Sequence, residues 1–414
     1  MKKTKIILLL FIFIIIYIYV ASVALIPKDI ILIQGEKLEL ATLWGINIKE
    51  TSNTNPNVGD YVTSKMLEVS SNSDSTLTQV GKINLNVNLF KNISLKNITI
   101  NVVPKTTVIP LGNAIGLKLY TKGVLVVGMS EIEGVKPYEN TGIEEGDRII
   151  AVNNISLSKT EELIDVVNKS DGKQIEVKYV SSNNEEKIVE MNPVKTKDNE
   201  YKLGLWVRDA AAGVGTLTFY EPKTGKLASL GHGITDVDTG ELVTIANGEL
   251  VTSNIVNITK GEKGKPGEIR GSIEGGNEIG EISTNTSFGV FGSVKNKNYL
   301  NITEKEMEVL SREEIKSGKA QIICEIENGK KKYYDIEIEK VYVANNYNNK
   351  SMLIKVIDEE LLDKTGGIVQ GMSGSPIIQE GKFVGAVTHV LVNDPTTGYG
   401  VFADMMLKQM SEVE

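Results

Sequence analysis

The segment that decides the fold reads Gly371-Met372-Ser373-Gly374-Ser375-Pro376, and an apolar run follows it at once. Glycine adopts backbone angles that other residues avoid, so a serine between two glycines fits a tight turn that exposes the hydroxyl. The amides of Gly371 and Ser373 can then form an oxyanion hole for an acyl-transfer intermediate. A plain turn between two strands is the alternative for a motif this short.

A nucleophilic serine needs a base, because its hydroxyl is weakly nucleophilic near neutral pH. Histidine suits this role, and the chain contains only 2 histidines. His232 lies in a Gly-His-Gly turn that precedes Ser373 in the chain, and we expect it to be the base. His389 is a rival base that we instead expect to line the substrate pocket with Thr388. Ser375 is a rival nucleophile.

The strands after this turn carry a resemblance to known proteases. The runs Gly385-Ala386-Val387-Thr388-His389 and Gly398-Tyr399-Gly400-Val401-Phe402 follow the serine. This order resembles the second barrel of chymotrypsin-like serine proteases. The chain as a whole resembles the stage IV sporulation protein B family, and the resemblance places Ser373 in the nucleophile slot.

The acid that would orient the histidine is less clearly marked. In chymotrypsin-like enzymes it lies between the histidine and the serine, and four residues of that stretch remain open from the residues alone: Asp236, Asp238, Glu274 and Asp335. The family resemblance points instead to Asp358, at the end of an apolar strand. A solvated carboxylate at the start of a loop is the alternative for that residue.

A second motif, Gly142-Ile143-Glu144-Glu145-Gly146-Asp147-Arg148-Ile149, resembles the signature of bacterial PDZ domains. Gly142 and Gly146 would let the backbone turn, and Asp147 would hydrogen-bond the loop. PDZ domains bind peptides by adding them as a strand to a sheet edge. We expect that edge to be supplied by Gly123, Val124, Leu125 and Val126. A PDZ-like unit that only packs against the protease is the alternative.

The N-terminus combines basic residues with an apolar run that extends to Ile26. Roughly 20 apolar residues suffice to cross a bilayer, and preceding positive charge places the bulk of the chain outside the cytoplasm. We expect residues 1–26 to be a transmembrane signal-anchor. The small residues of Ser22-Val23-Ala24 leave cleavage as an alternative.

The remaining chain predicts a mainly β protein, with short strands separated by glycine-rich turns. Residues 117–128 predict a pair of strands joined by a tight turn, residues 304–315 a polar helix, and residues 53–60 and 70–75 polar loops. We expect a small β-sandwich-like region at 27–104, a PDZ domain at 105–194 and a chymotrypsin-like double β-barrel at 195–414. A net charge of -8 argues against nucleic-acid binding. The lone Cys324 lies in a strand-like run and is expected in the core. No cofactor or metal is predicted.

The resemblance implies an extracytoplasmic serine endopeptidase of sporulation, acting between the membranes of the developing spore. Such an enzyme would cleave a membrane-bound regulator, and itself, to trigger activation of a late sigma factor. Its partners would be that protein substrate, a PDZ ligand peptide and the membrane. Two alternatives are a non-catalytic PDZ scaffold with a protease-like fold and a general quality-control serine protease.

Overall fold

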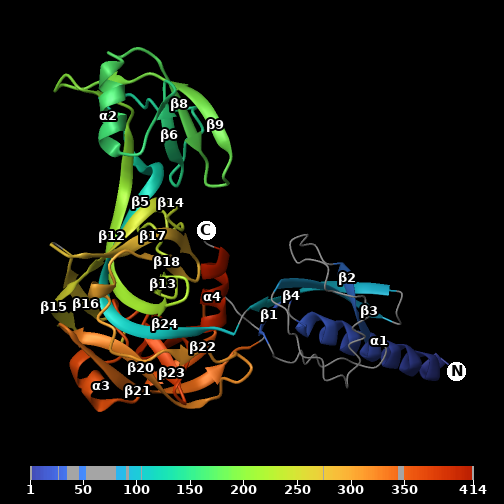
Figure 1. The fold of residues 1–414 in the computed structure, drawn as a ribbon. Coiled ribbons are helices and arrows are strands. Elements are labelled where there is room, and N and C mark those ends of the chain that lie inside the picture. The colour runs from blue at the N-terminus through green and yellow to red at the C-terminus, as the bar shows by residue number, and fades with distance from the viewer. Residues whose placement is uncertain are drawn as a thin grey trace.

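The computed structural model describes residues 2–26, 28–34, 46–52, 81–89, 93–103, 105–273, 275–343 and 349–412. Within these ranges the chain builds separate hydrophobic cores for an N-terminal unit, a ring of strands, a small domain and a closed barrel. Strands dominate every unit after the first helix, so the predicted mainly β fold is confirmed. Figure 1 shows the small domain, in green, standing apart from the two strand rings.

The N-terminal unit consists of one helix and one sheet. Its elements are α1 (Lys2–Leu25), β1 (Asp29–Ile33), β2 (Ile46–Ser52), β3 (Gly81–Leu89) and β4 (Ile93–Val103). The strand order is β1-β4-β3-β2, and Tyr19 and Val23 of α1 pack against the core of this sheet. The described part of this unit is therefore a helix on a sheet and not the expected sandwich.

Two details of this region bear on the N-terminal predictions. Over the portion of the chain described here, no helix meets the length and hydropathy that a bilayer crossing requires. The polar segments 53–60 and 70–75, predicted as loops, lie outside the described residues.

The first ring contains six strands from distant parts of the chain. They are β5 (Thr107–Met129), β12 (Leu205–Glu221), β13 (Lys226–Ser229), β14 (Ile245–Thr252), β17 (Glu278–Thr286) and β18 (Gly289–Val294). They pair in the order β12-β13-β18-β17-β14-β5, and a further pairing of β5 with β12 closes the ring. Because side chains alternate along a strand, Ile115, Leu117 and Leu119 of β5 contribute to one interior core.

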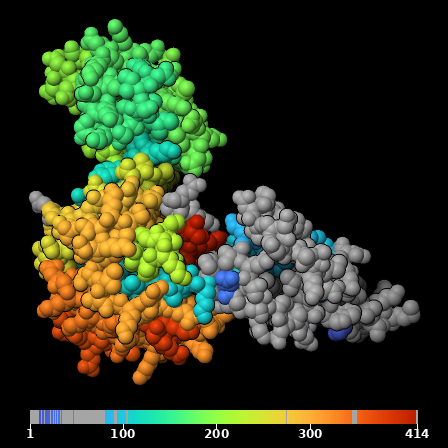
Figure 2. Space-filling view, viewed as in Figure 1, coloured from blue at the N-terminus to red at the C-terminus, as the bar shows by residue number. Residues whose placement is uncertain are grey.

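The small domain is inserted into this ring. Its elements are β6 (Arg148–Val152), β7 (Ile155–Ser156), α2 (Thr160–Lys169), β8 (Ile175–Val180), β9 (Glu186–Met191), β10 (Val194–Lys195) and β11 (Tyr201–Lys202). β5 leaves the ring near Thr121 and continues into the domain, and β12 returns from it. Figure 2 shows the domain projecting from the main body. Residues 107–121, placed in the PDZ domain by the sequence, thus belong to the ring.

The second barrel is closed by six strands. They are β20 (Gly318–Glu327), β21 (Lys330–Val341), β22 (Met352–Val356), β25 (Asp394–Phe402), β24 (Lys382–Leu391) and β23 (Pro376–Gln379). The helices α3 (Glu359–Thr365) and α4 (Ala403–Glu412) flank it. Cys324 is 1% exposed inside this core, and burial raises the pKa of its thiol, as its predicted core position requires.

Three shorter elements complete the description: the hairpin of β15 (Asn254–Thr259) and β16 (Glu268–Ser272), the 3-10 helix η1 (Lys297–Tyr299), and β19 (Met307–Glu308).

Two local predictions are wrong. Residues 117–128 do not form a tight hairpin, because β5 runs through them as one strand and bends where Gly123 has a φ of 92°. The segment 304–315 is not a helix. It contains β19, which pairs with the start of β5, while Leu310 and Ile315 enter the barrel core. Burial in tertiary contacts outweighs its polar, helix-like composition.

Candidate active site

The serine turn lies between α3 and β23 and is pressed against the first ring. Gly371 and Gly374 have φ angles of 97° and 96°. A Cβ on Gly374 would lie 2.3 Å from the carbonyl oxygen of Thr216 and 2.6 Å from the amide nitrogen of Leu230. Only glycine fits this position, because both the backbone angle and the space exclude a side chain.

Thr216 of β12 fastens the turn from the opposite ring. Its amide donates to the carbonyl of Ser373 at 3.0 Å, and its hydroxyl donates to the carbonyl of Gly371 at 2.8 Å. Thr216 is buried. It was not among the residues selected from the sequence, since a threonine in a strand carries no signal of such a contact.

The backbone amides of this turn fall into two groups. Those of Gln370, Met372, Gly374 and Ser375 donate to the carbonyls of Gly267, Val369, Val387 and Met372. Among the described residues, no acceptor is bonded to the amides of Gly371 and Ser373, the pair expected to form an oxyanion hole. Two free amides on residues that line a cleft can stabilise a developing oxyanion.

His232 lies just after β13, at the junction of the two rings. Leu230 and Gly231 have φ angles of 71° and 69°, which turn the chain sharply. A leucine in this left-handed region is strained, and such strain concentrates at functional sites. A Cβ on Gly231 would lie 3.2 Å from the Thr388 methyl group of the second barrel. The close approach of the two rings therefore places the imidazole between them.

Backbone bonding and burial define the state of this imidazole. Nδ1 lies 2.8 Å from the carbonyl of Gly233, so a protonated Nδ1 donates to it and leaves Nε2 free to accept a proton. Burial lowers the pKa of His232, although the bond to Gly233 opposes the effect. The neutral base form is thereby favoured.

One cleft of about 720 Å³ collects the predicted residues. Ser373, Gly371 and His232 line it with the predicted pocket residues Thr388 and His389. Its rim includes Ala211, Ala212, Gly213 and Val214 from β12. The structure therefore brings together side chains that are far apart in the sequence.

The serine hydroxyl and the imidazole share no hydrogen bond among the described contacts. Ser373 Oγ donates instead to the carbonyl of Thr388 at 2.7 Å. The rival Ser375 is completely buried, and its hydroxyl donates to Met372 at 2.7 Å. Ser373 is thus the accessible serine of the motif, held in a resting orientation.

His389 packs beside His232. The ring centroids are 5.1 Å apart with an interplanar angle of 35°. The pKa of His389 is lowered, first by burial of its inner side and then by the positive charges of His232 and Lys350. Its outer side is exposed, and solvent there limits the effect. This placement fits the predicted pocket-lining role.

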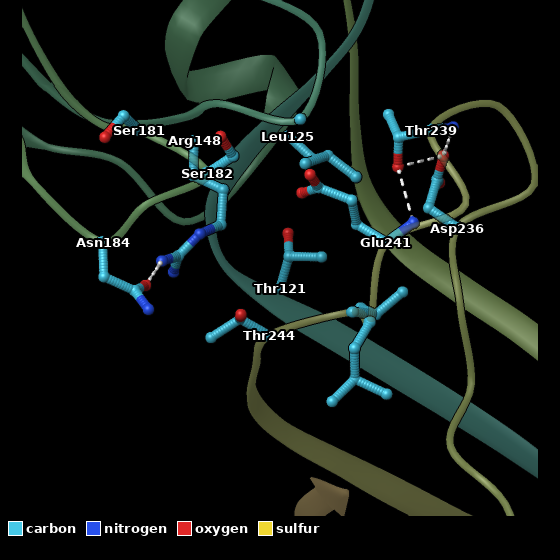
Figure 3. A pocket seen from close by; sticks show the side chains of 13 residues that line it. Thr121, Leu125, Arg148, Ser181, Ser182, Asn184, Asp236, Thr239, Glu241 and Thr244 are labelled. Atoms are coloured by element: carbon cyan, nitrogen blue, oxygen red, sulfur yellow. Dashed lines mark hydrogen bonds between the residues drawn. The ribbon is translucent and has the colours of Figure 1, made fainter. Parts of the chain in front are cut away.

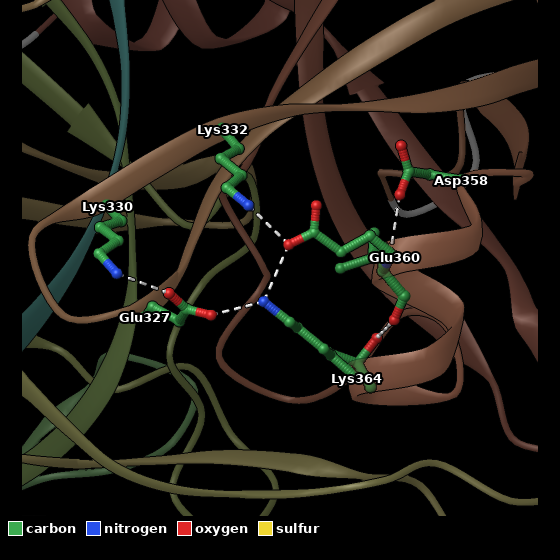
Figure 4. Close-up of polar contacts among 8 residues, drawn as sticks. Glu327, Lys330, Lys332, Asp358, Glu360 and Lys364 are labelled. Atoms are coloured by element: carbon green, nitrogen blue, oxygen red, sulfur yellow. Dashed lines mark hydrogen bonds and ion pairs between the residues drawn. The ribbon is translucent and has the colours of Figure 1, made fainter.

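Asp358 lies away from the cleft, which corrects its assignment as the acid that orients His232. One carboxylate oxygen accepts from the amide of Leu361 at 2.9 Å and caps α3, as Figure 4 shows. The other accepts from the amide of Asp335 at 3.3 Å. The helix N-terminus thus uses the carboxylate, and the bond to Nδ1 of His232 comes from a backbone carbonyl.

The other acid candidates are also engaged elsewhere or undescribed. Asp236 and Asp238 pair with Arg208, and Asp335 accepts from Gln321 at 2.8 Å. Glu274 lies outside the described residues. No group of three or more potential metal-binding side chains occurs in the described part of the chain.

The predicted peptide-binding edge of the small domain is wrong. Leu125 pairs with Arg148 of β6 on one side and Arg208 of β12 on the other, so this stretch of β5 has no free edge. Of the other residues predicted for this edge, Gly123, Val124 and Val126, Val124 pairs with Ile149 of β6. Val126 pairs with Val207 of β12, and its amide and carbonyl bond to Asp147 and Gly146. The loop prediction holds, since Asp147 accepts from the amides of Glu144 at 2.9 Å and Ser182 at 3.2 Å.

An apolar groove of about 510 Å³ lies on another side of this domain. Leu163, Ile164 and Val167 of α2 form one wall, and residues 205–207 at the start of β12 form the other. Among the described strands, only β5 pairs with residues 205–207, so their second edge faces the groove. The groove could not be predicted from the sequence, because its two walls are about 40 residues apart in the chain.

Comparison with protein families gives one match. The profile described as SpoIVB peptidase S55 matches residues 199–407, which is half of the chain. No curated protein matches the sequence.

Three solved structures illustrate the structural similarity. The PDZ domain of the SdrC-like protein from Listeria monocytogenes has 16% identity, covers 21% of this chain and 87% of its own, and gives a TM-score of 0.18. The HtrA-type protease AlgW with a decapeptide has 13% identity, 49% and 53% coverage and a TM-score of 0.30. The active form of the M. tuberculosis Rv3671c protease has 13% identity, 61% and 86% coverage and a TM-score of 0.27. This chain spans about half of the AlgW chain, and similarity this low carries no inference about activity.

Proposed function

This chain belongs to the SpoIVB peptidase S55 family, and from that premise we propose that it is a serine endopeptidase of sporulation. Its substrate is a membrane-bound regulatory protein, whose cleavage triggers activation of a late sigma factor, and it also cleaves itself. The observation that carries the peptidase proposal is the meeting of Ser373, His232 and two free turn amides in one cleft.

The chemistry follows from that arrangement. His232 Nε2 takes the proton of the Ser373 hydroxyl as Oγ attacks the carbonyl carbon of the scissile bond. The amides of Gly371 and Ser373 stabilise the oxyanion of the tetrahedral intermediate. The protonated imidazole then gives its proton to the leaving amine, and water releases the acyl group by the same steps in reverse.

The Ser373 hydroxyl must rotate away from Thr388 before it can reach His232. In enzymes without substrate, catalytic hydrogen bonds are often long or poorly aligned, and they tighten only in the substrate complex. The carbonyl of Gly233 supplies the acceptor that holds Nδ1. The proposed machinery is therefore a serine–histidine pair oriented by backbone.

We further propose that the protein is anchored outside the cytoplasm by residues 1–26. The support is the sequence, in which basic residues precede an apolar run that extends to Ile26. The small domain acts as a PDZ domain that takes an extended peptide into the groove beside α2. The support is the unpaired edge at 205–207 next to an apolar helix face.

The experiment compares the full-length protein with Ser373→Ala, using casein hydrolysis and self-cleavage as readouts. We expect both reactions to disappear in the variant. Ser375→Ala is the matched control, because that serine is buried and bonded within the turn. Equal cleavage by the protein and by Ser373→Ala would reject the peptidase proposal and leave the scaffold alternative.

A further inference from the structure

Two neighbouring residues of β12, Arg208 and Asp209, reach in opposite directions. The guanidinium of Arg208 bonds to Asp236 and, at 2.7 Å, to Asp238 in the loop that follows His232. The carboxylate of Asp209 accepts from the amide of Thr160 at 2.7 Å, at the start of α2. One strand thus contacts both the helix that walls the peptide groove and the loop of the catalytic histidine.

Asp236 organises that loop. Its carboxylate is buried and accepts from the amides of Asp238 at 3.0 Å and Thr239 at 3.1 Å. Its own amide donates to Glu241 at 2.8 Å, and its carbonyl accepts from Gly240 at 2.9 Å. A buried carboxylate with this many donors holds one loop conformation. Only three residues separate it from His232.

The loop also touches the small domain directly. A Cβ on Gly146 would lie 2.9 Å from a carboxylate oxygen of Glu241. Figure 3 shows Glu241 and Asp236 on one side of a pocket whose other side carries Arg148 and Asn184. Movement of the small domain against the ring would therefore displace this loop.

The strand that lines the groove continues directly into Arg208 and Asp209. Residues 205–207 line the groove, and Arg208 and Asp209 come next on the same strand. The pairing of β12 with β5 shifts register between Arg208 and Ala210. A register irregularity marks a place where a strand can bend.

We propose that Asp236 is a positioning residue for His232, and that Arg208 and Asp209 couple it to α2, so that a peptide in the groove alters the catalytic imidazole. The coupling to the groove rests on the proposed function. The two linked elements are α2, which forms one wall of the groove, and the loop 233–242. Asp209 bonds to the first and Arg208 to the second from adjacent positions on β12, so a shift of one element strains the bonds to the other.

The test measures labelling of the full-length protein by a fluorophosphonate, which reacts with a serine activated by a base. We expect Arg208→Gln and Asp236→Asn each to lower the maximal labelling rate by about tenfold to a hundredfold, as small misplacements of catalytic groups do. The double variant is no slower than either single variant. The apparent affinity for the probe stays unchanged, since the cleft walls remain.

The coupling is tested with Asp209→Ala. We expect it to slow labelling about fivefold when Arg208 is present and to have no further effect with Arg208→Gln. Lys178→Gln is the matched control, because it removes a charge paired with Glu186 in the small domain without touching the loop. If Arg208→Gln fails to fold, Arg208→Lys takes its place in the test. Lysine keeps the charge but bridges two carboxylates poorly, so we expect an intermediate labelling rate.

The outcomes separate the two proposals. A wild type that is not labelled overturns the proposed function and this inference with it. A labelled wild type with unaffected, folded Arg208→Gln and Asp236→Asn overturns the positioning role alone. If Asp209→Ala slows labelling as much in the Arg208→Gln background as it does alone, the coupling is overturned.

Discussion

The Ser373 hydroxyl donates a 2.7 Å hydrogen bond to the carbonyl of Thr388. This bond engages the proton that His232 would remove under the proposed mechanism, and both side chains line the same cleft. The resting bond joins the nucleophile turn to β24, the strand that also carries His389.

Removing either member of the serine–histidine pair should abolish most turnover. We expect Ser373→Ala and His232→Ala each to lower kcat/KM by several orders of magnitude, and the double variant to be no worse, because the residues act as a unit. His389→Ala should keep activity within about tenfold, since its ring only lines the pocket. Steady-state kinetics on one peptide substrate measures all four. A larger loss with His389→Ala than with His232→Ala would exchange the two roles.

The pH dependence should follow the lowered pKa of His232. Because burial disfavours the charged imidazole, the acid limb of kcat/KM should lie below the ordinary histidine value of about 6.5. Stability has the same sign: the unfolded chain binds the proton more tightly, so folding free energy is lost as pH falls below that value. Rate profiles and urea unfolding between neutral and acid pH measure both effects. An acid limb above the ordinary value would contradict the buried, neutral base.

Asp358 should behave as a helix cap. Asparagine is also a good N-cap, so Asp358→Asn should retain most stability and turnover, whereas Asp358→Ala should lose about 1 kcal/mol of unfolding free energy. Urea denaturation and kcat/KM measured on the same preparations distinguish the two. If Asp358→Asn stays fully stable but loses turnover by orders of magnitude, the carboxylate is catalytic after all.

Gly374 should not tolerate a side chain. In Gly374→Ala the new methyl group would meet the Thr216 carbonyl and the Leu230 amide, so the serine turn must shift away from the first ring. We expect a loss of turnover of at least about a hundredfold, as misplaced catalytic groups show. Gly381→Ala is the control: its φ is 76° but nothing lies within 4 Å, so only backbone strain is added. Similar kinetics for the two variants would remove the packing argument.

The small domain should be removable only along its true boundaries. Tyr120 and Ala210 are paired neighbours, so a short turn can join them after residues 122–208 are removed. We expect this variant to fold and keep peptide hydrolysis while losing substrate selection, although loss of Arg208 slows it. Deletion of 105–194 should prevent folding, because it removes the ring portion of β5. Circular dichroism and casein hydrolysis measure the two; a folded 105–194 deletion would contradict the inserted arrangement.

Local patterns were enough to predict the serine turn, a histidine that lines the same cleft, two turn amides without an acceptor among the described residues, and the PDZ-type loop. Glycines with special backbone angles and a buried aspartate that binds its own loop are determined by near neighbours in the chain, so their signals survive in sequence. Alternating strands with glycine turns predicted a β-barrel or sandwich, and the expectation of two barrels came from the resemblance to chymotrypsin-like proteases.

The partners of these residues depended on tertiary structure. Asp358 was misassigned because its carboxylate could either cap a helix or orient a histidine. The peptide-binding edge was misassigned to residues 123–126 because a strand edge is free only if no distant strand pairs with it. The sequence by itself determined which groups could do the chemistry and which segments would be strands. Only the folded chain decided that a backbone carbonyl holds His232, that Thr216 fastens the serine turn, and that the small domain interrupts the ring, because each depends on contacts between segments far apart in the chain.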